Sequence, residues 1–178
     1  NSVARGEMSI DRRDIVCGLP YPLLCGLWFD HHAGNAEALK LRGIDSGSLP
    51  GRFSQEPSCA RVVFEYFTEK GTDFPEFYLD TVREADTIDS FDYGSIEEWR
   101  AETPGKLLDM SIKAPFETPR ERTKYHGYIV EMIRNRPLAD ITLEERVVLN
   151  IERYKREEKK MVEILGGTAG FMEKDNAR

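Results

Sequence analysis

Two of the three histidines of this chain stand side by side, directly behind an aspartate, in the segment GLWFDHHAGN. These residues are Asp30, His31 and His32, and a short apolar run at residues 24–29 leads into them. A histidine next to a carboxylate suits manganese, iron or zinc. If the apolar run is a strand of a parallel sheet, the three side chains lie at its carboxyl end, where open α/β folds bind their ligands. The tripeptide is therefore compatible with a ligand or metal site. Taken alone, it favours the simpler interpretation that both histidines lie in a loop beside an aspartate that caps a helix.

An acidic and a basic segment further along the chain are also candidates. Asp86 in EADTIDSFD lies near the end of a predicted helix, where its type alone favours a hydrogen bond to Thr87 or Ser90 over metal binding. Four basic side chains lie within seven residues: Arg120, Arg122, Lys124 and His126. Such groups suit phosphate recognition, whereas charged runs are more commonly the solvated face of an amphipathic helix.

The elements that must position these residues begin with two short apolar runs, residues 14–19 and 24–29, bounded by proline or polar residues. Their length and composition predict buried strands of a parallel sheet. The following segment, residues 43–55, is dense in Gly, Ser and Pro and predicts a loop. Residues 57–70 and 75–86 carry apolar residues at helical spacing and predict two amphipathic helices.

The C-terminal half has a helical pattern almost throughout. The predicted helices cover residues 95–102, 119–136 and 142–165. In the last of these, Thr142 and Glu145 have the spacing of a capping box. One apolar stripe runs along it: Leu143, Val147, Ile151, Tyr154, Met161 and Ile164. The glycines of GGTAG at residues 166–170 indicate a helix stop rather than a phosphate-binding loop.

The overall composition excludes several classes of protein. The chain has 178 residues, of which 40% are hydrophobic, enough for one globular domain with a sizeable core. Its net charge of −7 gives no general reason to bind nucleic acid or an anionic membrane. No apolar run approaches the roughly 18 residues that span a bilayer, and the N-terminal segment lacks the apolar core of a signal peptide. A cytoplasmic protein is therefore predicted.

The three cysteines, Cys17, Cys25 and Cys59, are odd in number and have no C-x-x-C spacing. Their apolar surroundings predict buried, reduced thiols rather than disulfides. A structural zinc bound by Cys17, Cys25 and His31 is the alternative, although its spacing matches no usual zinc pattern.

Three motifs stand in the order found in a known family: FDHH at the end of a strand, PSCARVVFEYF as the helix that follows, and EADTIDSFD as the fourth motif. On these motifs the chain resembles the DHH phosphoesterases, and the run CGLPYPLLCGLWFDHH is most similar to their exopolyphosphatase-related branch. The resemblance implies an α/β fold with a parallel sheet flanked by helices, a DHH phosphoesterase-like core that ends in a long connector helix. It places the core at residues 1–141, the connector helix at 142–166 and, at 167–178, a tail that leads to a second domain.

The resemblance also implies manganese- or magnesium-dependent phosphohydrolysis with two metal ions, which anionic oxygens must bridge. His31 and Asp86 would ligate the metals, while Asp30 and His32 would be the catalytic groups, with His32 facing the substrate. The basic residues Arg120, Arg122, Lys124 and His126 would bind the substrate. The expected partner is a small phosphate-containing molecule, polyphosphate or a short oligonucleotide. No extended groove for nucleic acid is evident from the sequence, and a homodimer is compatible with this function.

Two departures from the family pattern leave the activity open. The aspartate of the second motif corresponds to Gly18, and glycine cannot ligate a metal. Asp14 lies at the other end of that strand, about 13 Å away, and the first motif is absent from the residues ahead of it. One hypothesis is therefore a metal-dependent hydrolase of the exopolyphosphatase or oligonucleotide-hydrolase type. The other is a degenerate domain of the same fold that binds, regulates or scaffolds without hydrolysis.

Overall fold

The chain forms two compact units, each with a hydrophobic core of its own. The computed structural model describes the backbone of residues 8–175 and the side chains of residues 8–166. We call Asn1–Trp99 the N-terminal unit and Arg100–Arg178 the C-terminal unit. The predicted core of residues 1–141 therefore spans the first unit and part of the second.

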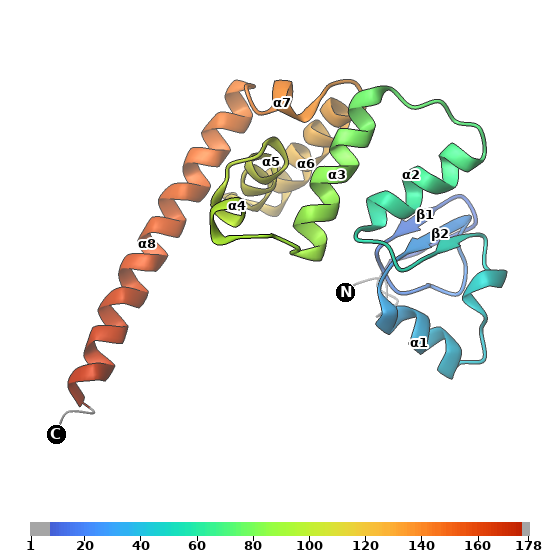
Figure 1. The fold of residues 1–178 in the computed structure, drawn as a ribbon, viewed down its shortest axis with the longest axis horizontal. Helices are drawn as coiled ribbons and strands as arrows, with labels where there is room; N and C mark the ends of the chain where they lie inside the picture. The colour runs from blue at the N-terminus through green and yellow to red at the C-terminus, as the bar shows by residue number, and fades with distance from the viewer. Residues whose placement is uncertain (1–7, 176–178) are drawn as a thin grey trace. The chain divides into compact units, whose positions relative to one another are not determined.

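The N-terminal unit is built on three short parallel strands in the order β1-β2-β3 (Figure 1). The strands are β1 (Ile15–Cys17), β2 (Leu27–Asp30) and β3 (Gly51–Phe53). Cys17 pairs with Phe29, and Asp30 pairs with Phe53. Because the strands are parallel, their carboxyl ends meet at one edge of the sheet.

The helices of this unit are α1 (Ala33–Leu41), the short 3-10 helix η1 (Ser46–Ser48), α2 (Cys59–Glu69), α3 (Glu76–Ser90) and α4 (Ile96–Arg100). Helix α1 and η1 lie between β2 and β3 in the chain. Helix α2 packs against β2, β3 and α3. It begins after Ser58, whose hydroxyl accepts a hydrogen bond from the Arg61 N–H at 3.1 Å. This cap satisfies one of the free N–H groups of the first helical turn.

Strand β2 lies between β1 and β3, and side chains pack against both of its faces. Trp28 and Phe29 are fully buried, and successive side chains of a strand point to opposite faces. Trp28 belongs to a core cluster with Val16, Cys25 and Leu39. On the other face, Phe29 packs against the α2 rings Tyr66 and Phe67. This packing on both faces fixes the position of Asp30, the last residue of the strand.

The C-terminal unit is helical and consists of α5 (Pro104–Lys113), α6 (Pro119–Ile133), α7 (Leu138–Ile141) and α8 (Glu145–Asp175). Helix α5 packs against the other three. The buried core comprises Leu108, Tyr125, Ile129, Leu138, Ile141, Val147 and Ile151. Thr118 and Glu121 form a capping box at the start of α6, which satisfies two backbone N–H groups.

The predicted fold class, a parallel sheet flanked by helices, is confirmed. The predicted strands overlap β1 and β2, but the predicted loop at 43–55 contains η1 and β3. Strand β3 depends on Gly51, whose φ of +115° lets its backbone approach Trp28. A Cβ on Gly51 would lie 2.0 Å from the Trp28 carbonyl oxygen. A three-residue strand that begins with a glycine carries no periodicity, so the sequence pattern could not reveal it.

Helix α8 differs from the predicted connector helix of residues 142–166 at both ends. Thr142 is the C-cap of α7 and has helical backbone angles, φ −66° and ψ −14°, so it does not take the extended conformation of an N-cap in a capping box with Glu145. The helix also continues through Gly166, so the predicted glycine stop is wrong. Glycine inside a helix costs only about 1 kcal/mol, and flanking helix formers can offset this.

Other differences concern three helices that the sequence-based prediction missed, one of which, α5, does have an apolar face. Helices α1, α5 and α7 were not predicted from the sequence pattern. Helix α1 buries only Leu39, and α7 is four residues long. In α8 the predicted stripe is buried at Val147 and Ile151, whereas Leu143 and Met161 are 78% and 62% exposed. The apolar pattern therefore indicated a helix correctly but not which part of it is packed.

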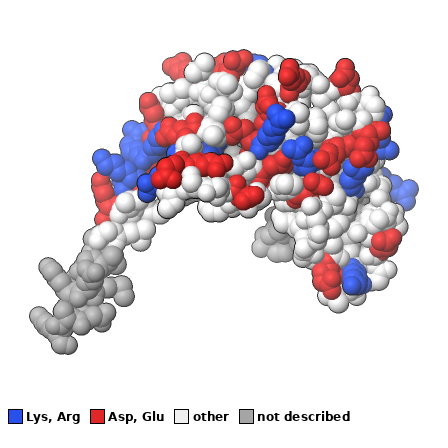
Figure 2. Space-filling model, viewed as in Figure 1, with Lys and Arg blue, Asp and Glu red and all other residues white. Residues whose placement is uncertain are grey.

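The cysteines are all free. Cys25 is buried as predicted, whereas Cys17 is exposed and Cys59 is half-buried. Over the described part of the chain, no helix is both long and apolar enough to cross a membrane. Figure 2 shows acidic and basic side chains interspersed over the visible face, so this face has no broad basic surface for a nucleic acid.

Candidate functional site

Asp30 organises the turn that follows β2. Its side chain is fully buried, and Oδ1 accepts hydrogen bonds from the His31 and His32 backbone N–H groups at 2.8 and 3.2 Å. The same oxygen lies 2.6 Å from Nδ1 of His32, and Oδ2 accepts from the Asn35 amide at 2.6 Å. The carboxylate thus holds both histidines at the carboxyl edge of the sheet.

His31 is held in one orientation with one ring nitrogen left over. Nδ1 lies 3.0 Å from the Glu56 carbonyl oxygen, which can only accept, so Nδ1 carries the proton and donates. In the neutral ring, Nε2 then has a free lone pair. Nε2 is buried and has no hydrogen-bond partner within the described residues. It nevertheless lies 3.2 Å from Oδ2 of Asp89, so the histidine and a carboxylate face each other without a hydrogen bond.

Asp86, the predicted metal ligand on α3, is occupied by other partners. Its Oδ1 accepts from the Ser58 hydroxyl at 2.7 Å, and its Oδ2 accepts from Nε of Arg61 at 3.0 Å and from the same guanidinium's Nη2. Asp89 is the carboxylate that faces His31. It lies three residues further on the same helix, a spacing that places two side chains on one face. That spacing was the signal that could have found Asp89.

The end of β1 contributes no carboxylate to this edge. Gly18 donates its N–H to the Phe29 carbonyl oxygen at 2.9 Å and adopts a φ of +62°, which suits glycine. A Cβ there would meet only the Cβ of Cys59, at 3.8 Å. Gly18 follows Cys17 and Asp30 follows Phe29 in paired strands, so the two positions are neighbours.

The thiols beside Gly18 perturb each other. A hydrogen bond between the Cys17 and Cys59 side chains lowers the pKa of Cys17. The same hydrogen bond, together with burial, raises the pKa of Cys59. Both thiols line an almost wholly apolar hollow of about 310 Å³ with Phe64, Phe74 and Val82. This hollow offers no charged group to a phosphate, so it is not a candidate substrate site.

The described residues do not build a complete two-metal centre. Across residues 8–166, no three or more His, Cys, Asp or Glu side chains are grouped so that they could hold a metal ion. This finding also excludes a preformed zinc site of Cys17, Cys25 and His31 within that range. His31 and Asp89 face each other and could supply two ligands to an ion. Two protein ligands suit a manganese or magnesium ion whose coordination is completed by water and substrate phosphate oxygens.

His32 is placed to face solvent. Its side chain is 51% exposed, and Asp30 accepts the proton of Nδ1, which leaves Nε2 directed away from the carboxylate. Directly after His32, helix α1 begins, and a hollow of about 560 Å³ lies between α1 and the η1 segment. Glu37, Lys40 and Asp45 give this hollow charged walls.

The predicted substrate-binding residues lie on α6, in the C-terminal unit, whereas Asp30, His31, His32 and Asp86 belong to the N-terminal unit. Three of these basic side chains are exposed: Arg120, Arg122 and Lys124. His126 is half-buried, with Nε2 3.5 Å from the Ile112 carbonyl oxygen. Of the four, Lys124 lines a cavity of the C-terminal unit.

Comparison with known proteins identifies the fold. No protein-family model and no curated protein matches the chain. Among solved structures, the chain is similar to the pGpG-specific phosphodiesterase PggH from Vibrio cholerae, with a TM-score of 0.67 and 22% sequence identity. The similarity covers 89% of this chain and 50% of PggH, so the chain spans about half the length of that protein. The likeness supports the predicted DHH phosphoesterase-like fold and does not point to the exopolyphosphatase-related branch.

Proposed function

We propose that this chain carries part of the active site of a phosphoester hydrolase, located where β2 ends. The observation that carries the proposal is the pair of His31 and Asp89: a buried imidazole Nε2 without a hydrogen bond, 3.2 Å from a carboxylate oxygen. Two lone-pair atoms this close need a cation between them, which is either a proton on Nε2 or a metal ion, and the proposal takes the metal ion. The fold shared with a phosphodiesterase supports this choice.

In this proposal His31 and Asp89 hold a divalent cation, Mn²⁺ or Mg²⁺, in place of the predicted pair of His31 and Asp86. When bound, such a cation polarises a phosphoryl group and lowers the pKa of its water. Asp30 fixes the tautomer of His32 through Nδ1, so Nε2 of His32 is free to exchange a proton with a group at the exposed edge. Arg61 neutralises Asp86 and holds α2 and α3 together behind the site.

The proposed substrate is a small phosphate-containing molecule. Short oligonucleotides come first because the chain shares its fold with a phosphodiesterase. Polyphosphate comes second because the run CGLPYPLLCGLWFDHH is similar to the exopolyphosphatase-related branch. We propose a cytoplasmic location, in keeping with three cysteines that are all free. A homodimer is compatible with this function.

A second candidate is a domain of the same fold that binds a phosphate-containing ligand without hydrolysing it. Two observations favour it: Gly18 supplies no carboxylate at the end of β1, and both oxygens of Asp86 are engaged by Arg61 and Ser58. To separate the two candidates, both hydrolysis and ligand binding have to be measured on the same variants.

The deciding experiment follows Mn²⁺-dependent hydrolysis of short oligonucleotides, polyphosphate and bis(p-nitrophenyl) phosphate. We expect His31→Ala to abolish turnover and Asp89→Asn to lower it at least about tenfold, as removal of metal-site groups does. Asp92→Asn changes an exposed aspartate just beyond the same helix and should have no effect. If the unaltered chain releases no product but binds an oligonucleotide in a His31-dependent way, the binding domain is the correct proposal.

A further inference from the structure

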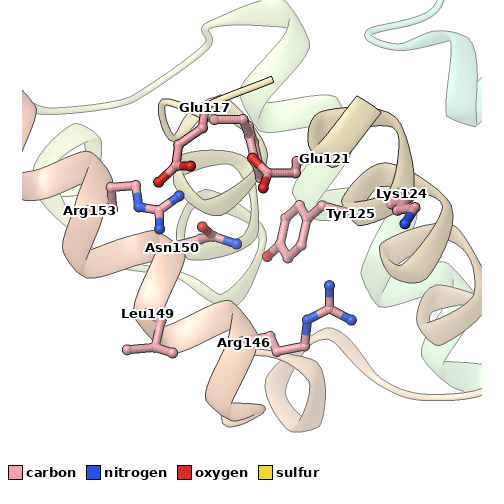
Figure 3. Close-up of a pocket in the computed structure, with 9 residues that line it drawn as sticks. Glu117, Glu121, Lys124, Tyr125, Arg146, Leu149, Asn150 and Arg153 are labelled. Atoms are coloured by element: carbon pink, nitrogen blue, oxygen red, sulfur yellow. The ribbon is translucent and has the colours of Figure 1, made fainter. Parts of the chain in front are cut away.

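A separate cavity lies in the C-terminal unit, between α6, α8 and the segment that joins α5 to α6 (Figure 3). Its volume is about 280 Å³. The polar side chains that matter most are Glu117, Glu121, Tyr125, Arg146, Asn150 and Arg153. The proposed hydrolase site uses none of them, so an inference about this cavity does not rest on the proposed function.

The floor of the cavity contains a polar group without a partner. Tyr125 is 2% exposed, and its hydroxyl is buried without a hydrogen bond to any described residue. Figure 3 shows this hydroxyl pointing toward Asn150 of α8, which is itself 8% exposed. Since buried hydroxyls are normally hydrogen-bonded, the orphaned Tyr125 points to a ligand oxygen that completes the site.

Two guanidinium groups of α8, Arg146 and Arg153, line the same cavity as Glu117 and Glu121 but make no ion pair with them. Arg146 stacks on the Tyr128 ring at 4.6 Å, and Arg153 donates to the Pro115 carbonyl oxygen at 3.2 Å. Neither makes an ion pair with a described residue, whereas Arg136 nearby is paired with Glu144. Arg146 and Arg153 are seven residues apart, two turns along one face of the helix. Two unpaired guanidinium groups at one cavity suit an anion with several oxygens, such as a phosphate.

The cavity also contains hydrogen-bond acceptors that an inorganic anion would not satisfy. Glu117 and Glu121 line the side formed by the start of α6, and one oxygen of Glu121 already accepts the Thr118 N–H at 3.3 Å. These carboxylates repel a bare phosphate but accept hydrogen bonds from hydroxyl or amino groups. A ligand that combines a phosphate with such donors therefore matches both halves of the cavity.

We propose that this cavity binds a small phosphomonoester of about mononucleotide size. The phosphate lies between Arg146 and Arg153, with an oxygen toward Asn150 and the Tyr125 hydroxyl, and the hydroxyl or amino groups of the ester face Glu117 and Glu121. The volume is at the lower end of the range for ligand pockets, which favours a monomer over a longer oligonucleotide.

Calorimetric titration of the whole chain with AMP, GMP, adenosine and inorganic phosphate tests this assignment. We expect AMP or GMP to bind, adenosine and inorganic phosphate to bind at least about tenfold more weakly, and His31→Ala to leave this binding unchanged. Arg146→Gln and Arg153→Gln should each weaken it by at least about tenfold, the effect expected for a lost charge-assisted bond. Tyr125→Phe should weaken mononucleotide binding about threefold or more. The Tyr125 hydroxyl makes no hydrogen bond to a described residue, so its removal breaks none within this part of the chain.

Arg156→Gln is the matched control, because Arg156 is an exposed arginine of the same helix outside the cavity. It should bind the mononucleotide as the unaltered chain does. The proposal is overturned if no mononucleotide binds, if inorganic phosphate binds as tightly as AMP, or if the three cavity variants bind like the control. Binding that His31→Ala abolishes and Arg153→Gln does not would place the ligand in the N-terminal unit and also overturn it.

Discussion

At the scale of residues, the site depends on how two carboxylates of one helix are used. Asp86 and Asp89 are three residues apart on α3, yet Asp86 is bound by Arg61 and Ser58 while Asp89 faces His31. An ion pair removes a carboxylate from competition for a metal, because its charge is already compensated. The partners of each carboxylate, rather than its position in a motif, decide which one is available.

The Arg61–Asp86 pair is expected to stabilise the N-terminal unit. The two side chains are only 20% and 14% exposed, so Arg61→Gln leaves a largely buried carboxylate without its cation. We expect the free energy of unfolding to fall by about 1–3 kcal/mol, between the values for exposed and buried pairs. Arg83→Gln breaks the exposed pair with Asp80 on the same helix and should cost at most about 0.5 kcal/mol. Urea denaturation measures both, and equal losses would contradict the special role of Arg61.

The sequence predicted where the Asp30–His31–His32 segment lies but not which carboxylate faces His31. The Asp30–His31–His32 segment lies at the carboxyl edge of the sheet, as the apolar run before it indicated. Asp89 could not be preferred over Asp86 from the sequence, because the choice depends on Arg61, which lies 25 residues from Asp86 along the chain. The roles of His31, Asp86 and the basic residues of α6 stay predictions.

At the scale of elements, a comparison of β2 with β3 shows why the sequence pattern predicted one strand and not the other. Strand β2 has two fully buried aromatic residues and was evident, whereas β3 exists because the Gly51 backbone fits against Trp28. Helix α2 has both an apolar face and the Ser58 cap, while α1 has no capping side chain and no clear apolar face. Strand β3 and helix α1 carry little pattern of their own, whereas α5 was missed although it has an apolar face and the Thr103 cap.

The end of β1 offers a test of whether the missing carboxylate limits the site. We expect Gly18→Asp to raise the affinity for Mn²⁺ about tenfold, because it adds a carboxylate next to Asp30, where a Cβ has room. The positive φ at Gly18 costs about 1 kcal/mol for a residue with a side chain, and aspartate tolerates it better than most.

Gly18→Ala is the control for this substitution, because it has the same backbone cost without the carboxylate. Titration with Mn²⁺, followed by electron paramagnetic resonance, compares the two variants with the unaltered chain. Equal affinities for Gly18→Asp and Gly18→Ala would show that the end of β1 does not face the ion. A tighter ion together with faster hydrolysis would show that Gly18 limits a working site.

At the scale of the whole molecule, the chain combines a small sheet unit with a helical unit, each with its own core. The likeness to PggH covers 89% of the chain, more than either unit alone, so the shared fold includes residues of both. The resemblance to the DHH phosphoesterases implied one core over residues 1–141. Helical periodicity could not divide these residues between two cores, because it shows that a face is buried but not against which partner.

Separate cores predict that the two units lose their structure separately. Ile141 is fully buried in the C-terminal core, and Ile141→Ala should lower the free energy of unfolding of that unit by about 2–4 kcal/mol. Hydrogen exchange should then accelerate in α5, α6, α7 and the first half of α8, and stay unchanged in β1, β2 and β3. Val62→Ala, at a fully buried position of α2, is the counterpart and should give the reverse pattern. If each substitution instead accelerates exchange in both units, the cores unfold as one cooperative structure, and a ligand bound in one unit would stabilise the other.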